Sequence, residues 1–257
     1  MNRLTFARLT DVPAPKSSTK IQKRVQRPLV TAAARATLPQ CLLVPQHYER
    51  NYAYPLLVWL HDTGSDEREL RKIMPLVSLR NYVSLAIRGT CQADRGFGWS
   101  ESAGGILAAE SQVAEAVAQA RQRFHVHRER IFLTGAGAGG TMALRLALRA
   151  PEDYAGAASI GGCFPQGNSP LARLALARRS RLLIMHCRDS LTYPVKHVCD
   201  ELALFHAAGM SVTLRQYPCG DELTTQMLRD LDVWLMEQVT GSRSDREQEA
   251  TLPSEWN

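Results

Sequence analysis

From about residue 38 onward, the chain alternates short apolar runs with longer segments in which apolar residues recur at helical spacing. The clearest apolar run is Tyr54 to His61, which is continuous and not alternating. Such a run is typical of a strand buried on both faces of a parallel sheet. Further runs predict strands at 38–45, 82–87, 130–134, 154–160, 181–186 and 210–217.

The segments between these runs have the period of amphipathic helices. Residues 106–124 place Val113, Val117, Ala120 and Phe124 on one face, with Glu and Gln opposite. Further helices are predicted at 67–74 (interrupted or ended by Pro75), from the Gly-rich turn to about 150, from 195 to a cap at Gly209, and around 227–235. Strands that alternate with helices predict a three-layer α/β/α sandwich around a mostly parallel sheet.

The charge divides the chain into an arm, a body and a tail. Residues 1–36 contain a single acid, Asp11, and eight bases: Arg3, Arg8, Lys16, Lys20, Lys23, Arg24, Arg27 and Arg35. Residues 1–36 therefore carry a net charge of +7. The whole chain carries +6, so residues 37–257 carry −1. We predict an extended or irregular basic arm at 1–36, a globular domain at 37–240 and a polar tail at 241–257.

Composition excludes several classes of protein. The six cysteines show no Cys-x-x-Cys spacing, which argues against a zinc site and favours reduced thiols. No apolar run approaches the length of a membrane span, and the N-terminus has no apolar signal region. We therefore expect a cytoplasmic protein without a metal. The arm has few aromatic residues to stack on bases, so an acidic protein surface is a better partner for it than nucleic acid.

Residues 130–144 read as a short strand, a turn crowded with glycines and a helix of small residues. The same order occurs in a nucleophile elbow, where Gly-x-Ser-x-Gly raises a serine above the sheet. Here Gly135 and Gly139 match the two glycines of this motif, but Gly137 stands at the position of its serine. Glycine has no side chain, so the turn lacks a nucleophile.

Several stretches together resemble the α/β-hydrolase superfamily, in particular its small bacterial carboxylesterase/phospholipase-like esterases. They lie in the family's order at 55–64, 88–89, 96–99, 130–140, 183–194 and 217–222, within a similarity that covers about residues 38–240. The resemblance implies an α/β-hydrolase fold and, for an intact site, hydrolysis of carboxylic esters. It also implies that the backbone amides of Thr63 and Ala138 form the oxyanion hole.

The departures from the family pattern fall on the catalytic positions. The resemblance puts the triad serine at Gly137, the acid at Ser190 and the histidine at Asp221. Asp189 is adjacent to the acid position, and a shift of one residue would present it instead. No histidine follows position 206, and Asp62 replaces the usual glycine, which puts a carboxylate near the oxyanion hole. A negative charge there opposes the oxyanion that such a site stabilises.

Two other chemistries remain to be weighed. Residues 135–140 also match Gly-x-Gly-x-x-Gly, but the acids at Glu152 and Asp153 precede the next strand and so lie at the wrong end for a dinucleotide site. We therefore expect no cofactor. Cys187 and Cys219 follow neighbouring strands, and His186 is the one obvious base near them. We interpret both as buried reduced thiols.

Three classes of function are compatible with these residues. The first, which the missing triad favours, is a catalytically inactive hydrolase homologue (a pseudo-esterase) that acts as a scaffold or protein-interaction subunit. The second is a binder that holds a small ligand in the vacated hydrolase pocket. The third is a serine-independent ester hydrolase that uses Asp221, Asp189 or a cysteine. The oligomeric state stays open.

Overall fold

A computed structural model describes residues 39–241. The basic arm at 1–36 and the tail from 242 to 257 lie outside the described residues. The division into arm, domain and tail, and the proposed protein partner of the arm, therefore stay predictions. Within the described residues no helix is both long and apolar enough to cross a membrane.

The domain is built on a seven-stranded sheet with the strand order β1-β3-β2-β6-β7-β8-β9. β1 (Gln40–Leu43) pairs antiparallel with β3 (Val83–Ile87), and every other pair is parallel. The remaining strands are β2 (Tyr54–Leu60), β6 (Val126–Ala136), β7 (Gly156–Ile160), β8 (Arg181–Cys187) and β9 (Val212–Tyr217). This sheet confirms the predicted mostly parallel architecture.

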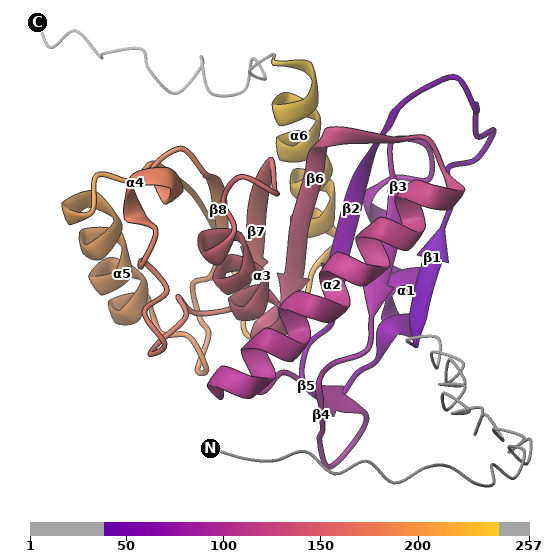
Figure 1. Cartoon of the computed structure of the whole chain (residues 1–257). Coiled ribbons are helices and arrows are strands. Elements are labelled where there is room, and N and C mark those ends of the chain that lie inside the picture. Colours follow the sequence, from indigo (N-terminus) through magenta and orange to yellow (C-terminus); the bar gives the residue numbers. More distant parts are fainter. Residues whose placement is uncertain (1–38, 242–257) are drawn as a thin grey trace, which may run out of the picture. The chain divides into compact units, whose positions relative to one another are not determined.

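Helices cover both faces of the sheet (Figure 1). One face carries α2 (Ala103–Arg123), α3 (Gly137–Arg149), the short α4 (Leu174–Ala177) and α5 (Val195–Ala207). The other face carries α1 (Leu70–Val77) and α6 (Thr225–Thr240). The three predicted layers are confirmed.

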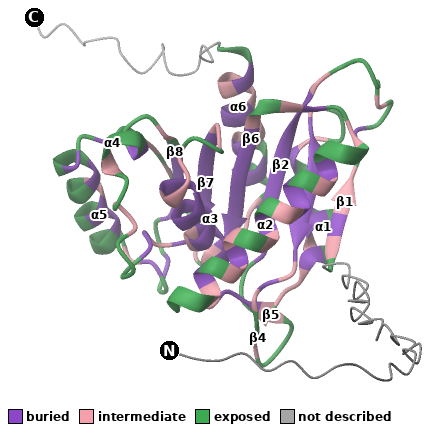
Figure 2. Ribbon diagram, in the orientation of Figure 1, coloured by how far each residue is buried: buried purple, intermediate pink, exposed green. Residues whose placement is uncertain are grey.

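The core has two halves because neighbouring residues of a strand point to opposite faces. In β2, Leu56, Val58 and Leu60 pack toward α2 and α3, whereas Leu57 and Trp59 pack toward α1 and α6. Every residue of β2 is buried, and Figure 2 shows the central strands as a continuous buried layer. This burial on both faces explains why the strand appears in the sequence as an unbroken apolar run.

One local expectation needs correction, and two short features were not predicted. Pro75 does not end the first helix: a 3₁₀ turn at Glu67–Glu69 leads into α1, which continues through Pro75 to Val77. The buried face of α1, made of Leu70, Ile73, Met74 and Val77, offsets the one hydrogen bond that the proline removes. The hairpin of β4 (Cys91–Gln92) and β5 (Phe97–Gly98), and α4, were not predicted, since each is too short for a periodic signal.

Candidate active site

A cavity of about 270 Å³ lies where the parallel strands end at their carboxyl edge. Ligands collect at this edge in open α/β sheets because the loops that follow several strands converge there. Residues that follow β2, β6, β7, β8 and β9 all contribute to its wall. The lining consists of Asp62, Glu69, Ala136, Gly137, Ile160, Gly161, Cys187, Thr192, Asp221, Glu222 and Leu223.

Gly137 stands at the turn from β6 into α3, where the predicted nucleophile position lies. Its φ is +49°, the left-handed conformation that glycine adopts without a steric penalty. A Cβ at this position would lie 2.2 Å from Oδ1 of Asp62 and 2.5 Å from its Oδ2. At Gly139 a Cβ would lie 2.1 Å from the carbonyl oxygen of Leu60, so this glycine lets α3 approach β2 closely. The space above the elbow is therefore taken by the Asp62 carboxylate.

Asp62 makes the hydrogen bonds that an oxyanion would make. Its Oδ1 accepts from the backbone N–H of Thr63 at 2.7 Å and from that of Ala138 at 2.9 Å. These are the two amides that the sequence assigns to the oxyanion hole. The sequence predicts a carboxylate near these amides. In the structure, one carboxylate oxygen accepts from both of them.

Ser190 and Asp221 are in direct contact. Ser190 Oγ donates to the Asp221 carboxylate, as does Thr192 Oγ1 at 2.7 Å. The backbone N–H groups of Leu191 and Thr192 donate to Oδ2 of Asp221 at 3.2 and 3.4 Å. The hydrogen bond from Ser190, then that from Thr192, hold the pKa of Asp221 below its ordinary value. The loop after β8 therefore stabilises an anion at the position where the resemblance puts a histidine.

Asp189 does not contribute to the cavity wall. Its carboxylate pairs with Arg188 at 3.0 Å, and both side chains are more than half exposed. The hydrogen bond from Arg188 lowers the pKa of Asp189. The structure therefore does not place Asp189 at the cavity.

The cysteine at the cavity is not an activated nucleophile. Burial, followed by a hydrogen bond with Cys219, raises the pKa of the Cys187 thiol to about 12. A thiol with such a pKa stays protonated at neutral pH, whereas a nucleophilic cysteine needs a lowered one. His186 is buried and directed elsewhere, since its Nε2 lies 2.8 Å from the Tyr193 carbonyl oxygen and its Nδ1 lies 3.2 Å from Nε2 of Gln216.

Two further acids line the cavity that sequence reasoning missed. Glu69 accepts a hydrogen bond from the indole Nε1 of Trp59 at 2.8 Å, and Glu222 follows Asp221 in the loop after β9. Together with Asp62 and Asp221 they make four acidic residues, and among residues 39–241 no lysine, arginine or histidine lines the wall. No sequence signal links Glu69 to this site, because it lies in the 3₁₀ turn before α1 and only the folded chain brings it to Trp59 of β2. Among residues 39–241, no group of three or more His, Cys, Asp or Glu side chains is arranged to hold a metal ion.

The sequence profile of the family described as phospholipase/carboxylesterase matches residues 94–238, more than half of the 257 residues. The chain belongs to this family. A comparison with curated proteins finds no match.

Solved structures of esterases and thioesterases share the fold. The Bacillus cereus carboxylesterase aligns with a TM-score of 0.65 at 18% identity and covers 79% of this chain and 96% of its own. The Zea mays acyl-protein thioesterase 2 aligns with a TM-score of 0.64 at 16% identity and covers 79% and 99%. The Mesorhizobium loti carboxylesterase aligns with a TM-score of 0.60 at 22% identity and covers 72% and 90%. The α/β-hydrolase fold is thereby confirmed for this family member.

Proposed function

We propose that this member of the phospholipase/carboxylesterase family does not hydrolyse esters and acts as a binding or scaffold protein. The observation that carries the proposal is the position of Asp62, whose Oδ1 accepts from the amides of both Thr63 and Ala138. Ester hydrolysis through a tetrahedral intermediate needs free donors at that place. Here the donors are engaged, and the group that engages them is negatively charged.

The other parts of the site support the same conclusion. Hydrolysis by a triad needs a nucleophile, an imidazole that accepts its proton and a carboxylate that orients the imidazole. Gly137 supplies no nucleophile. The hydrogen bonds to Asp221 lower the pKa of its carboxyl group, so its carboxylate is a weak base. The protonated Cys187 thiol does not replace the missing serine.

The experiment restores the site stepwise and measures hydrolysis of short-chain p-nitrophenyl esters. The first variant combines Gly137→Ser, Ser190→Asp and Asp221→His, and the second adds Asp62→Gly. We expect the natural protein to be inactive and the second variant to exceed the first by roughly 10²–10³-fold, because the first variant still has to fit the Asp62 carboxylate beside a new Cβ that would meet it at 2.2 Å, close to the oxyanion donors. The matched control adds Asp94→Gly to the first variant, since Asp94 is exposed and outside the cavity wall.

The outcomes separate the alternatives. Turnover by the natural protein that scales with its concentration and falls on Asp221→Asn or Cys187→Ser contradicts the proposal and favours a serine-independent hydrolase. If Asp94→Gly raises the rate as much as Asp62→Gly, the carboxylate in the oxyanion hole is not the barrier.

A second function, the binding of a small ligand, is favoured by the charge of the vacated cavity. Four acidic residues line a space of about 270 Å³, with Ile160 and Leu223 as apolar wall. Asp221 is held ionised by its hydrogen bonds. A carboxylate-lined site of this kind suits a small organic cation with an apolar body, such as an alkylammonium ion.

A thermal-shift comparison tests this second function. We expect n-butylammonium to raise the melting temperature and butyrate, its anionic counterpart, to leave it unchanged. The replacement Glu222→Gln lowers the shift without touching the hydrogen bonds of Asp221, and Glu129→Gln, on the exposed start of β6, is the matched control. Equal shifts with both compounds, or none, contradict cation binding.

A further inference from the structure

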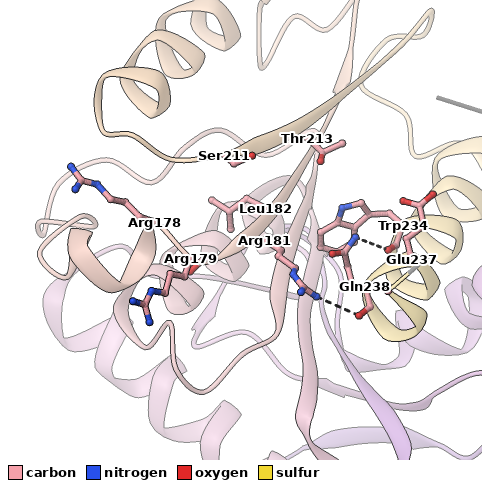
Figure 3. Close-up of a pocket in the computed structure, with 11 residues that line it drawn as sticks. Arg178, Arg179, Arg181, Leu182, Ser211, Thr213, Trp234, Glu237 and Gln238 are labelled. Atoms are coloured by element: carbon pink, nitrogen blue, oxygen red, sulfur yellow. Dashed lines mark hydrogen bonds between the residues drawn. The ribbon is translucent and has the colours of Figure 1, made fainter. Parts of the chain in front are cut away.

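The opposite edge of the sheet holds a second cavity, of about 430 Å³, with the reverse charge (Figure 3). It lies at the amino ends of β8 and β9, beside the last turns of α6. Cys187, at the other end of β8, lines the first cavity, so the two are separated by about 20 Å of strand at 3.3 Å per residue. Three arginines, Arg178, Arg179 and Arg181, line this second cavity against one acid, Glu237.

Most of the guanidinium N–H groups at this cavity are not used by the fold. Arg178 donates only through Nε, to the Ala208 carbonyl oxygen at 2.8 Å. Arg181 donates through Nη1 to the Gln238 carbonyl oxygen at 3.4 Å. Arg179 is exposed, and its side chain makes no hydrogen bond or ion pair within residues 39–241. Each guanidinium carries five donors, so this site retains a large unused capacity for anionic oxygen atoms.

Two hydroxyl groups add further hydrogen-bond donors to the wall of this cavity. Ser211 and Thr213 lie at the start of β9 and line the same cavity. Within the described part of the chain neither hydroxyl has a hydrogen-bond partner. Hydroxyls combined with guanidinium groups are a donor set suited to phosphate oxygens.

The arginines do not converge on one point. Figure 3 shows Arg181 directed toward Gln238 on α6, whereas Arg178 and Arg179 extend in the opposite direction, away from α6. A single phosphate cannot reach both sides. A ligand with several linked anionic groups can cross the cavity and engage them together.

We propose that this cavity is a binding site for a linear polyanion that carries several phosphate groups. The ligand lies across the starts of β8 and β9, with Arg181 at one side and Arg179 at the other. The hydroxyls of Ser211 and Thr213 donate to it between them. The site is independent of the carboxyl-edge cavity and of the proposed loss of hydrolysis.

Calorimetric titration of the full chain at constant ionic strength tests the proposal, with inorganic tripolyphosphate and orthophosphate as probes. We expect tripolyphosphate to bind at least about tenfold more tightly, because orthophosphate reaches one side only. The replacement Arg179→Gln weakens tripolyphosphate binding about tenfold, which corresponds to 1.4 kcal/mol. The exposed Arg179 side chain makes no hydrogen bond or ion pair within residues 39–241, so this replacement leaves the melting temperature unchanged.

Arg71→Gln is the matched control, since Arg71 is exposed on α1, outside this cavity. The arm at 1–36 also attracts polyanions through its eight bases, so the comparison of Arg179→Gln with Arg71→Gln decides. Selective weakening by Arg179→Gln supports the site. Equal affinities for the two probes, no binding, or equal effects of the two replacements overturn it.

Discussion

At the scale of single residues, the cavity depends on pairs of residues that contact each other. Gly137 leaves the space that the Asp62 carboxylate occupies, and a Cβ at 137 would force that side chain away from the amides of Thr63 and Ala138. Ser190 likewise provides the hydroxyl that Asp221 accepts from. Replacing any one of these four residues alone therefore disturbs its partner as well.

Glu201 illustrates how burial sets the behaviour of one group. It is 8% exposed, its Oε1 accepts from the N–H of Phe164 at 3.0 Å, and its Oε2 accepts from the Tyr193 hydroxyl. Burial raises the pKa of Glu201 above its ordinary value, although these hydrogen bonds and the nearby His197 and His186 oppose the shift. The folded state therefore holds the proton more tightly than the unfolded chain does.

The sign of the pH effect follows. The stability that protonated Glu201 contributes is fully present below the unfolded pKa, near 4.5, and is lost as pH rises through the raised folded pKa. We expect Glu201→Gln to melt at a higher temperature than the natural protein at pH 8, with the difference shrinking toward pH 4.5. Melting curves between pH 4.5 and 8 measure this. Glu129→Gln, at an exposed acid, serves as control, and a difference that grows at low pH contradicts the argument.

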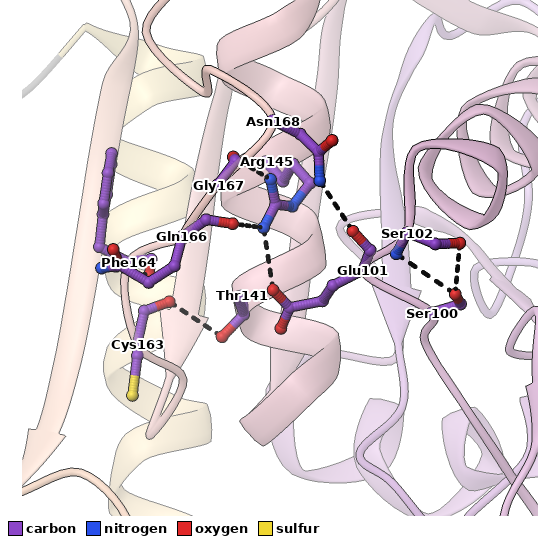
Figure 4. A network of polar contacts seen from close by, with 10 residues as sticks. All are labelled: Ser100, Glu101, Ser102, Thr141, Arg145, Cys163, Phe164, Gln166, Gly167 and Asn168. Carbon is purple, nitrogen blue, oxygen red and sulfur yellow. Dashed lines mark hydrogen bonds and ion pairs between the residues drawn. The ribbon is translucent and has the colours of Figure 1, made fainter.

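At the scale of elements, Arg145 connects α3 to two loops that are distant in sequence (Figure 4). Its guanidinium donates to the carbonyl oxygens of Gly167 at 3.0 Å and Gln166 at 2.7 Å, and pairs with Glu101 at 3.0 Å. Asn168 Nδ2 donates to the Glu101 carbonyl oxygen at 2.9 Å and closes the network. The Arg145 side chain is 1% exposed, and this burial lowers its pKa.

We expect Arg145→Met to lower the free energy of unfolding by roughly 3 kcal/mol, because two partly buried carbonyl groups lose their donor at roughly 1–3 kcal/mol each. Arg149→Met is the matched control on the same helix. Arg149 pairs with Glu110 at 3.0 Å, but both side chains are about one third exposed, so its loss costs about 1 kcal/mol or less. Urea denaturation of both variants measures the difference. Equal losses would mean that the network around Arg145 does not hold the loops.

At the scale of the whole molecule, folding separates charges that are mixed along the sequence. Residues 37–257 carry a net charge of only −1, which hides any asymmetry. In the structure, four carboxylates gather in the cavity at the carboxyl edge of the sheet, and three arginines gather in the cavity at its amino edge. All six parallel strands run the same way, so residues that follow strands meet at one edge and residues that precede strands meet at the other. If the two cavities bind the ligands proposed above, we expect added salt to weaken the affinity at each of them.

The sequence by itself determined the architecture and which residues stand where the resemblance puts the catalytic groups. Continuous apolar runs and helical periods predict the parallel sheet and its layers, because burial on two faces and an amphipathic stripe are local properties of the chain. The sequence alone shows that residue 137 is a glycine and that no histidine lies beyond position 206. The continuation of α1 through Pro75 was missed, because the packing that offsets the proline is not local.

Only the tertiary structure decided which contacts these residues make. Asp189 pairs with Arg188 in an exposed position, whereas Ser190 is buried and donates to Asp221. Glu69 lies at the cavity because the 3₁₀ turn before α1 places it against Trp59 of β2. Asp62 accepts from the amides of both Thr63 and Ala138 because α3 begins against the end of β2. These contacts join residues up to 76 positions apart, and their hydrogen-bond geometry exists only once the strands have set the distances between the loops.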